Sequence, residues 1–190
     1  MPVVTAKHIS TETKVITGDD LAALGAIGSY ELVAGRIVPM SPTGELHGGY
    51  EANFCAILRE FVKSHKLGKI RVGEVGIYTR RNPDTVRGAD VLFISNERYA
   101  QVASRSYLDV APDLIVEILS PNDVWSEVMQ KLREYFDIGV RTVWLADPQA
   151  RIVYVYRSMT DVREFKEHDD LIDEDVLPGF AAPVAAFFED

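Results

Sequence analysis

The run Leu114-Ile115-Val116-Glu117-Ile118-Leu119 decides how this 190-residue chain is expected to fold. Aliphatic residues occupy both faces of the extended strand predicted over 114–120, which is typical of a central strand in a sheet covered on both sides. Glu117 shares one face with Ile115 and Leu119. Because a lone buried carboxylate costs several kcal/mol, Glu117 needs a cationic partner, a hydrogen-bond partner or a metal ion.

The sequence around this strand predicts a mixed α/β sheet with helices on its faces. Ala34-Gly35 is a two-residue connection between expected hairpin strands. Helical spacing of apolar residues predicts a helix over 48–65, and Asp123 is expected to cap a second helix that ends at Gly139. The other expected elements are a short helix over 19–24 capped by Thr17, hairpin strands over 30–33 and 36–40, strands over 71–79, 89–95, 142–146 and 151–157, a short helix within 96–109, and an edge strand with a closing segment after Val162.

Length and composition predict one globular domain over residues 1–190, with residues 1–16 as a flexible arm. Hydrophobic residues make up 47% of the chain and charged residues 26%, and no apolar run approaches the length of a membrane span. The N-terminus lacks the plan of a signal peptide, so we expect a cytoplasmic protein without membrane partners. Cys55 and the scattered histidines lack zinc-finger spacing.

The net charge of −9 opposes nucleic-acid binding by the protein as a whole. Basic residues nevertheless cluster at Lys63, Lys66, Lys69 and Arg71, and again at Arg80, Arg81 and Arg87, while acidic residues gather over 161–175. The simplest interpretation is that all three groups are solvent-exposed faces.

Two further charges interrupt apolar patterns. Asp90 opens the expected strand Val91-Leu92-Phe93-Ile94, and Lys131 lies within the apolar stripe of the second helix. Each has a structural alternative: Asp90 as a strand-end cap, Lys131 paired with Glu127 or extending outward to solvent, and Glu117 as a satisfied core acid. Taken together, two carboxylates on neighbouring strands can bind Mg²⁺ or Mn²⁺, and a nearby lysine can stabilise the charge of a phosphate under attack.

The spacing of Asp90 and Glu117, with strands around both, resembles the PD-(D/E)XK nuclease superfamily. More narrowly, the chain resembles the Uma-two family of bacterial restriction endonucleases, which were assigned that activity mostly by analogy. The resemblance covers about Thr17 to Phe188 and is carried by Tyr30–Val38, Ser41-Pro42, His47, Asp90–Ile94, Ala111–Pro121, Lys131–Tyr135, Gly139-Val140, Trp144, Asp147-Pro148 and Leu177–Phe180.

The resemblance implies a restriction-endonuclease-like core and metal-dependent hydrolysis of phosphodiester bonds, with Asp90 and Glu117 as the metal ligands. Ala89 replaces the motif proline, and Leu119 stands where the superfamily has its lysine. The family brings a lysine from the following helix instead, a place that Lys131 holds.

Four further residues are candidate supporting residues. By the same resemblance Glu31 is a third acid, and His47 is a phosphate or water contact; hairpin pairing and helix capping are the alternatives. Glu74, on a strand face with Gly76 and Tyr78, is a possible further acid. Ser120 lies beside the expected site, as a ligand contact or as a strand-end cap, whereas Asp113 is expected to be structural because Pro112 precedes it.

Two other functions remain open. A metal-free glycosidase could use Asp90 and Glu117 as acid and base, although that leaves Lys131 without a role. The stronger alternative is a catalytically inactive nuclease fold that binds nucleic acid or protein. As an enzyme, the chain is expected to act on nucleic acid, DNA in the first instance, and by analogy as a homodimer.

Overall fold

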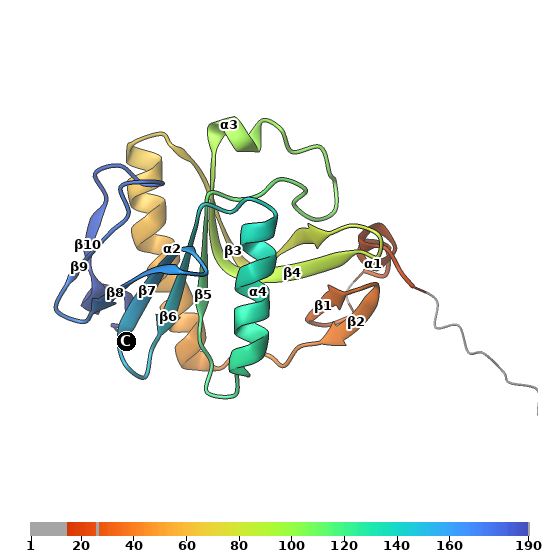
Figure 1. Ribbon diagram of the computed structural model, residues 1–190, viewed down its shortest axis with the longest axis horizontal. Helices are drawn as coiled ribbons and strands as arrows, with labels where there is room; N and C mark the ends of the chain where they lie inside the picture. The colour runs from red at the N-terminus through yellow and green to blue at the C-terminus, as the bar shows by residue number, and fades with distance from the viewer. Residues whose placement is uncertain (1–14, 26, 190) are drawn as a thin grey trace, which may run out of the picture.

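A mixed sheet with helices on both faces makes up the body of the molecule (Figure 1). The computed structural model describes residues 15–25 and 27–189. Within them the helices are α1 (Gly18–Ala23), α2 (Glu45–Ser64), α3 (Asn96–Tyr99), α4 (Trp125–Asp137) and α5 (Val184–Phe187). The strands are β1 (Tyr30–Val33), β2 (Arg36–Pro39), β3 (Gly68–Arg80), β4 (Thr85–Ser95), β5 (Leu114–Ile118), β6 (Thr142–Asp147), β7 (Ile152–Ser158), β8 (Asp161–Lys166), β9 (Asp170–Ile172) and β10 (Ala181–Pro183).

Strand β4 organises the large sheet, whose order is β2-β1-β4-β5-β6-β7-β8 with β3 added on β4. All neighbours are antiparallel except β5 and β6, which helix α4 connects in parallel. Strand β4 pairs with β1 at Val86 and with β5 from Val91 onward. Between these two pairings a short stretch of β4 has no strand partner on that side, and side chains must satisfy its backbone groups.

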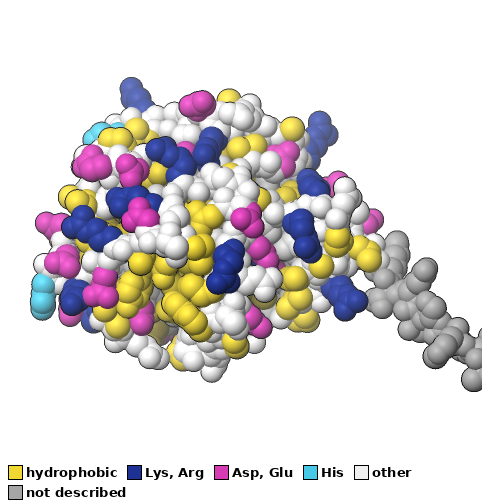
Figure 2. All heavy atoms as spheres, in the orientation of Figure 1, with side chains coloured by type: hydrophobic (Ala, Val, Ile, Leu, Met, Phe, Trp, Pro, Cys, Tyr) yellow, Lys and Arg dark blue, Asp and Glu magenta, His cyan; other side chains and the backbone are white. Residues whose placement is uncertain are grey.

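The two faces of the sheet carry different cores. Helix α2 and the C-terminal segment cover one face, where Phe54, Trp144 and Phe187 are fully buried. Helix α4 covers the other face through Leu132 and Tyr135. In Figure 1 α2 and α4 lie on opposite sides of the strands, and Figure 2 shows that hydrophobic side chains gather beside α4, over β6 to β8, among mixed basic and acidic residues.

The structure confirms most predicted elements, including the hairpin, both long helices and the central strand. Thr17 caps α1 in a reciprocal capping box with Asp20. Several boundaries shift by a few residues, and the places predicted for Asp90 and Asp123 were wrong. Strand β4 begins at Thr85, so Asp90 lies inside the strand and does not open it. Helix α4 is capped at Val124 without a side-chain bond, because Asp123 accepts the backbone N–H of Ser120 instead.

The predicted N-terminal arm falls mostly on residues 1–14, which lie outside the described residues. Ile16, at its end, donates its N–H to the carbonyl of Gly35 and so is attached to the hairpin turn. Across the described residues, no helix combines the length and the apolarity needed to cross a bilayer.

Candidate active site

The unpaired stretch of β4 brings Asp90 and Glu117 together. Val91 pairs with Val116, so the same register sets Asp90 across from Glu117, with both side chains on the face that α4 covers. Asp90 is 5% exposed and Glu117 9%. The backbone N–H of Ile118 donates to Asp90 Oδ2 at 2.7 Å, which fixes that carboxylate at the end of β5.

Helix α4 supplies two groups that hold Glu117. Lys131 Nζ lies 2.7 Å from Glu117 Oε2, and the Tyr135 hydroxyl donates to Glu117 Oε1 at 2.7 Å. One helical turn separates Lys131 from Tyr135, so both point at the same strand. Lys131 pairs with Glu117 from the sheet and not with Glu127, the alternative that the sequence left open. Its ammonium also lies 3.5 Å from Glu31 Oε1.

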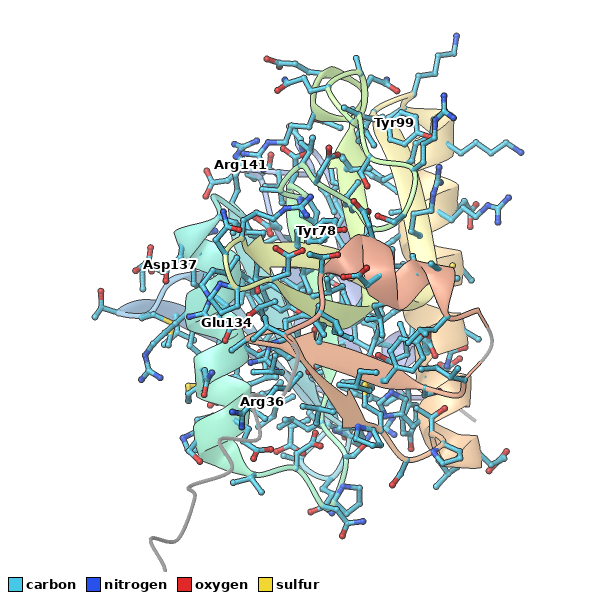
Figure 3. All side chains as sticks on the ribbon, turned by 90° about the vertical axis from the view of Figure 1, so that its right-hand side faces the viewer. Arg36, Tyr78, Tyr99, Glu134, Asp137 and Arg141 are labelled. Carbon is cyan, nitrogen blue, oxygen red and sulfur yellow. The ribbon has the colours of Figure 1, made fainter. Side chains whose placement is uncertain are left out.

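Glu31 reaches the site from the hairpin. Its carboxylate accepts a backbone hydrogen bond of β4 that a neighbouring strand would otherwise accept. Its Oε1 accepts the N–H of Gly88 at 3.1 Å, a backbone group in the unpaired stretch of β4. Its Oε2 accepts from Arg87 at 2.7 Å, and Arg87 also donates twice to Glu134 on α4. Figure 3 shows Glu134 on α4 beside the hairpin. Because Arg87 bonds to Glu134 on α4 and to Glu31 in the hairpin, it links these two elements.

His47 approaches Asp90 from the first turn of α2. His47 Nε2 is 3.6 Å from Asp90 Oδ1, and the other ring nitrogen is 3.2 Å from the hydroxyl oxygen of Ser120. Ser120 therefore orients the imidazole of His47, and this contact is how Ser120 contributes to the site. Nearby, Glu51 on α2 accepts the N–H of Gly73 at 2.7 Å and anchors the helix to β3.

A bulge in β3 turns Glu74 toward the same place. The register shifts between Val72 and Val75, and Glu74 has a φ of 54°, an uncommon conformation for a residue with a side chain. Glu74 Oε2 lies 2.6 Å from where a side chain on Gly88 would begin, so a side chain at position 88 would displace the Glu74 carboxylate. Glu74 and Gly88 also line a cavity of about 240 Å³, which reaches the surface between the hairpin and β3.

Burial, together with the surplus of carboxylates over cations, sets the protonation of the cluster. Burial raises the pKa of Glu117 above its ordinary value, although the charge of Lys131 works against the shift. Burial and the charge of Asp90 raise the pKa of Glu74. Burial lowers the pKa of Lys131, but Glu117 and Glu31 outweigh it and hold the ammonium protonated. Asp90 raises the pKa of His47 against the effect of burial.

The carboxylates of the cluster are the chemical type of ligand that a hard divalent cation takes, but they are not arranged as a complete coordination site. Among residues 15–25 and 27–189, no group of three or more acidic, histidine or cysteine side chains is arranged as a metal site. Both oxygens of Glu117 are already bonded by Lys131 and Tyr135. Two buried atoms beside Asp90 nevertheless have no hydrogen-bond partner, Glu74 Oε2 and His47 Nε2. Carboxylate oxygens left in this state are the ligands that Mg²⁺ and Mn²⁺ take.

The structure brings all seven sequence-predicted residues into one neighbourhood: Glu31, His47, Glu74, Asp90, Glu117, Ser120 and Lys131. Asp113 lies apart, accepting the N–H of Ser95 and pairing with Arg98, as its structural assignment predicted. Tyr135 and Arg87 also belong to this neighbourhood, although the sequence did not predict them as site residues. Tyr135 reads as core by its helical spacing, and its place one turn after Lys131 was the available signal.

Comparison with known proteins adds the family. The family model Uma2, described as "Putative restriction endonuclease", matches residues 19–185. The chain belongs to the Uma2 family. This Uma2 chain is also similar to the crystal structure of "a putative nuclease belonging to DUF820" from Anabaena variabilis ATCC 29413, with a TM-score of 0.73 and 20% identity over 91% of this chain and 97% of that one. The likeness confirms the expected nuclease-like fold, and the family match confirms the resemblance. A search of the curated proteins gave no match.

Proposed function

We propose that this protein is a divalent-metal-dependent nuclease that hydrolyses phosphodiester bonds in DNA. The observation that carries the proposal is the meeting of Asp90 and Glu117 across adjoining strands, with Lys131 reaching Glu117 from the facing helix. Membership of a family described as restriction endonucleases and the nuclease-like fold support it. Asp90 and Glu117 would hold the metal, with Glu74 as a third carboxylate.

The reaction adds water across one P–O bond: the new bond joins the water oxygen to phosphorus, and the bond to the leaving oxygen breaks. A bound Mg²⁺ or Mn²⁺ would neutralise phosphate oxygens and lower the pKa of the attacking water. The products are a phosphate monoester and a free hydroxyl group. Because negative charge grows on the phosphate during attack, a fixed cation beside it lowers the barrier.

The chain's own residues have separate tasks in this proposal. Lys131 Nζ supplies the fixed positive charge, held in place by Glu117 and Glu31. Tyr135 and the N–H of Ile118 orient the two carboxylates. His47, oriented by Ser120, would carry the proton that the leaving oxygen takes up, since Asp90 raises its pKa.

A second candidate function is a nuclease fold without turnover that binds nucleic acid or protein. One observation favours it: Lys131 and Tyr135 occupy both oxygens of Glu117, so this carboxylate must exchange a partner before it can bind a metal. Under this alternative the cluster would only stabilise the fold, as buried ion pairs with complete hydrogen bonding can.

The deciding experiment compares isosteric changes of two buried aspartates. Wild type should nick supercoiled plasmid DNA with Mg²⁺ or Mn²⁺, and EDTA should stop it. Asp90→Asn should reduce the rate at least about a thousandfold, the scale lost with a main electrostatic group, while Asp173→Asn on the other face should not. Calorimetric Mn²⁺ binding should weaken in Asp90→Asn as well. A folded wild type that neither binds Mn²⁺ nor cleaves DNA or RNA would leave the second candidate.

We further propose a homodimer, because two-fold pairs are the commonest assemblies of soluble proteins and a two-fold pair would present one active site to each strand of a duplex. The hydrophobic side chains beside α4 over β6 to β8 are the face that supports this assembly (Figure 2). Light scattering on the purified protein measures the mass directly, and a monomer across the concentrations that support cleavage would contradict the dimer.

A further inference from the structure

A basic groove lies at the C-terminal end of α2, away from the candidate active site. The groove has a volume of about 450 Å³, and no acidic residue lines it. Its basic side chains come from α2, from the turn after it and from β3, and all are exposed: Arg59, Lys63, Lys66, Lys69 and Arg71. In a chain with a net charge of −9, such a site is a strong local reversal of the overall field.

The cations of this groove are available to a ligand. Across the described ranges 15–25 and 27–189, no carboxylate oxygen lies within 4.0 Å of any of the five basic groups. The second basic cluster of the sequence differs, because Arg87 is held by Glu31 and Glu134, and Arg81 by Asp84. Among the described residues, the first cluster therefore keeps its whole charge for a partner, whereas the second keeps it only at Arg80.

The wall of the groove is held in position by hydrogen bonds. Lys66 has a φ of 56°, and its carbonyl accepts from the Asn96 side chain at 2.7 Å. The backbone of Asn96 donates to Leu67, which in turn donates to Val62 on α2. The turn between α2 and β3 is thus tied to both neighbours, so binding an anion there requires little ordering.

An aromatic ring stands beside the cations. Tyr99, at the end of α3, is 40% exposed, and the Arg71 guanidinium lies over its ring at 5.5 Å from the centroid. Figure 1 places α3 beside the C-terminal end of α2, and Figure 3 shows Tyr99 at that end of the molecule. Basic side chains together with an exposed aromatic ring are the combination that proteins use for the backbone and bases of nucleic acid.

We propose that this groove binds the phosphate backbone of the nucleic acid whose scissile bond lies at Asp90. The inference rests on the proposed function and names where the rest of the substrate is held. His47 and Lys63 are 16 residues apart on one helix, which is roughly 24 Å, or about seven base pairs of duplex. A polymer with regularly spaced phosphates spans that length, whereas a small anion does not. The Tyr99 ring favours nucleic acid over an acidic polypeptide.

The test measures binding without cleavage, in full-length Asp90→Asn protein, by fluorescence anisotropy of a labelled 20-base-pair duplex and of the matching single strand. Adding Lys63→Gln, Lys66→Gln and Lys69→Gln should weaken binding about tenfold or more at 0.15 M salt and flatten its dependence on salt by up to about three phosphate contacts. The matched control removes three exposed arginines outside the groove, Arg105→Gln, Arg133→Gln and Arg163→Gln.

The outcomes separate this inference from the proposed function. Unchanged DNA affinity in the lysine triple, or an equal loss in the arginine triple, overturns the groove. Equally tight binding of polyglutamate assigns the groove to acidic protein and overturns it too. If the lysine triple loses affinity but wild type cleaves neither DNA nor bis(p-nitrophenyl) phosphate, the groove stands and the nuclease proposal fails. If wild type cleaves both, DNA cleavage should fall more than diester hydrolysis in the lysine triple.

Discussion

The two faces of the large sheet differ in polarity: one is almost entirely apolar, and the other contains buried charged residues. The face under α2 is closed by aromatic stacking, such as Phe54 on Phe187 with ring centroids 4.4 Å apart, and its buried polar contact is Trp144 with Asp173. The face under α4 carries Glu117 and Lys131 among its apolar residues. Burial of charge is costly, so the α2 face supplies stability, whereas the α4 face carries the charges on which the proposed chemistry depends.

The largest effect is expected on the apolar face. Phe54→Ala removes a fully buried ring and should lower the free energy of unfolding by about 4 kcal/mol. DNA cleavage per folded molecule should remain. Urea unfolding, with activity measured at low temperature, tests both parts. A variant as stable as wild type would contradict the stabilising role of the α2 face. Loss of cleavage by the folded fraction would contradict the separation of the two faces.

Lys131→Met addresses the charged face. Removing the ammonium leaves Glu117 and Glu31 without their shared cation and should cost about 3 kcal/mol, as breaking a buried pair does. Cleavage should be lost, while calorimetric Mn²⁺ binding persists. Adding Glu117→Gln should restore most of the stability without restoring cleavage. Wild-type cleavage by Lys131→Met would show that the lysine is structural.

Glu134→Gln tests the ion pair between α4 and β4. Burial raises the pKa of Glu134, but hydrogen bonds from Arg87 and Gln130 outweigh it, so the pKa lies below its ordinary value of 4.5. The ionised form is therefore favoured in the folded protein, and its contribution is full above about pH 4.5 and is lost as the pH falls through the folded pKa. The variant should be about 2 kcal/mol less stable at pH 7. Denaturation at several pH values should show this difference shrinking in acid; a constant difference would contradict it.

Asp173→Asn is expected to have the smallest effect, and the opposite sign. Burial raises the pKa of Asp173 above 3.8, so the folded protein favours the neutral acid and loses stability as the pH rises through the folded pKa. Asparagine keeps an acceptor for the Trp144 N–H without the charge. At pH 7 the variant should match wild type or exceed it by up to about 1 kcal/mol. Thermal melts from pH 3 to 8 are the measurement, and a less stable variant at pH 7 would contradict it.

These faces also mark how far the sequence could predict the molecule. Glu117 in an aliphatic run and Lys131 in an apolar stripe break local patterns, so periodicity alone found them. The start of β4 was not predictable, because the charged Arg87 interrupts the apolar pattern there. Its partners Glu31 and Glu134 lie 56 and 47 residues away on other elements. Asp123 has the residue type of a helix cap, but the turn after β5 uses it to bind Ser120. Contacts that are distant in sequence decided both cases.

The unpaired stretch of β4 makes Gly88 an unusual reporter. A carboxylate of the hairpin, and no adjacent strand, covers the Gly88 N–H. Hydrogen exchange at the Gly88 amide is therefore slow only while the Glu31 carboxylate stays bonded to it. If a cation or a substrate draws Glu31 away, the exchange rate of this one amide should rise, and a deuterium-exchange spectrum would record it.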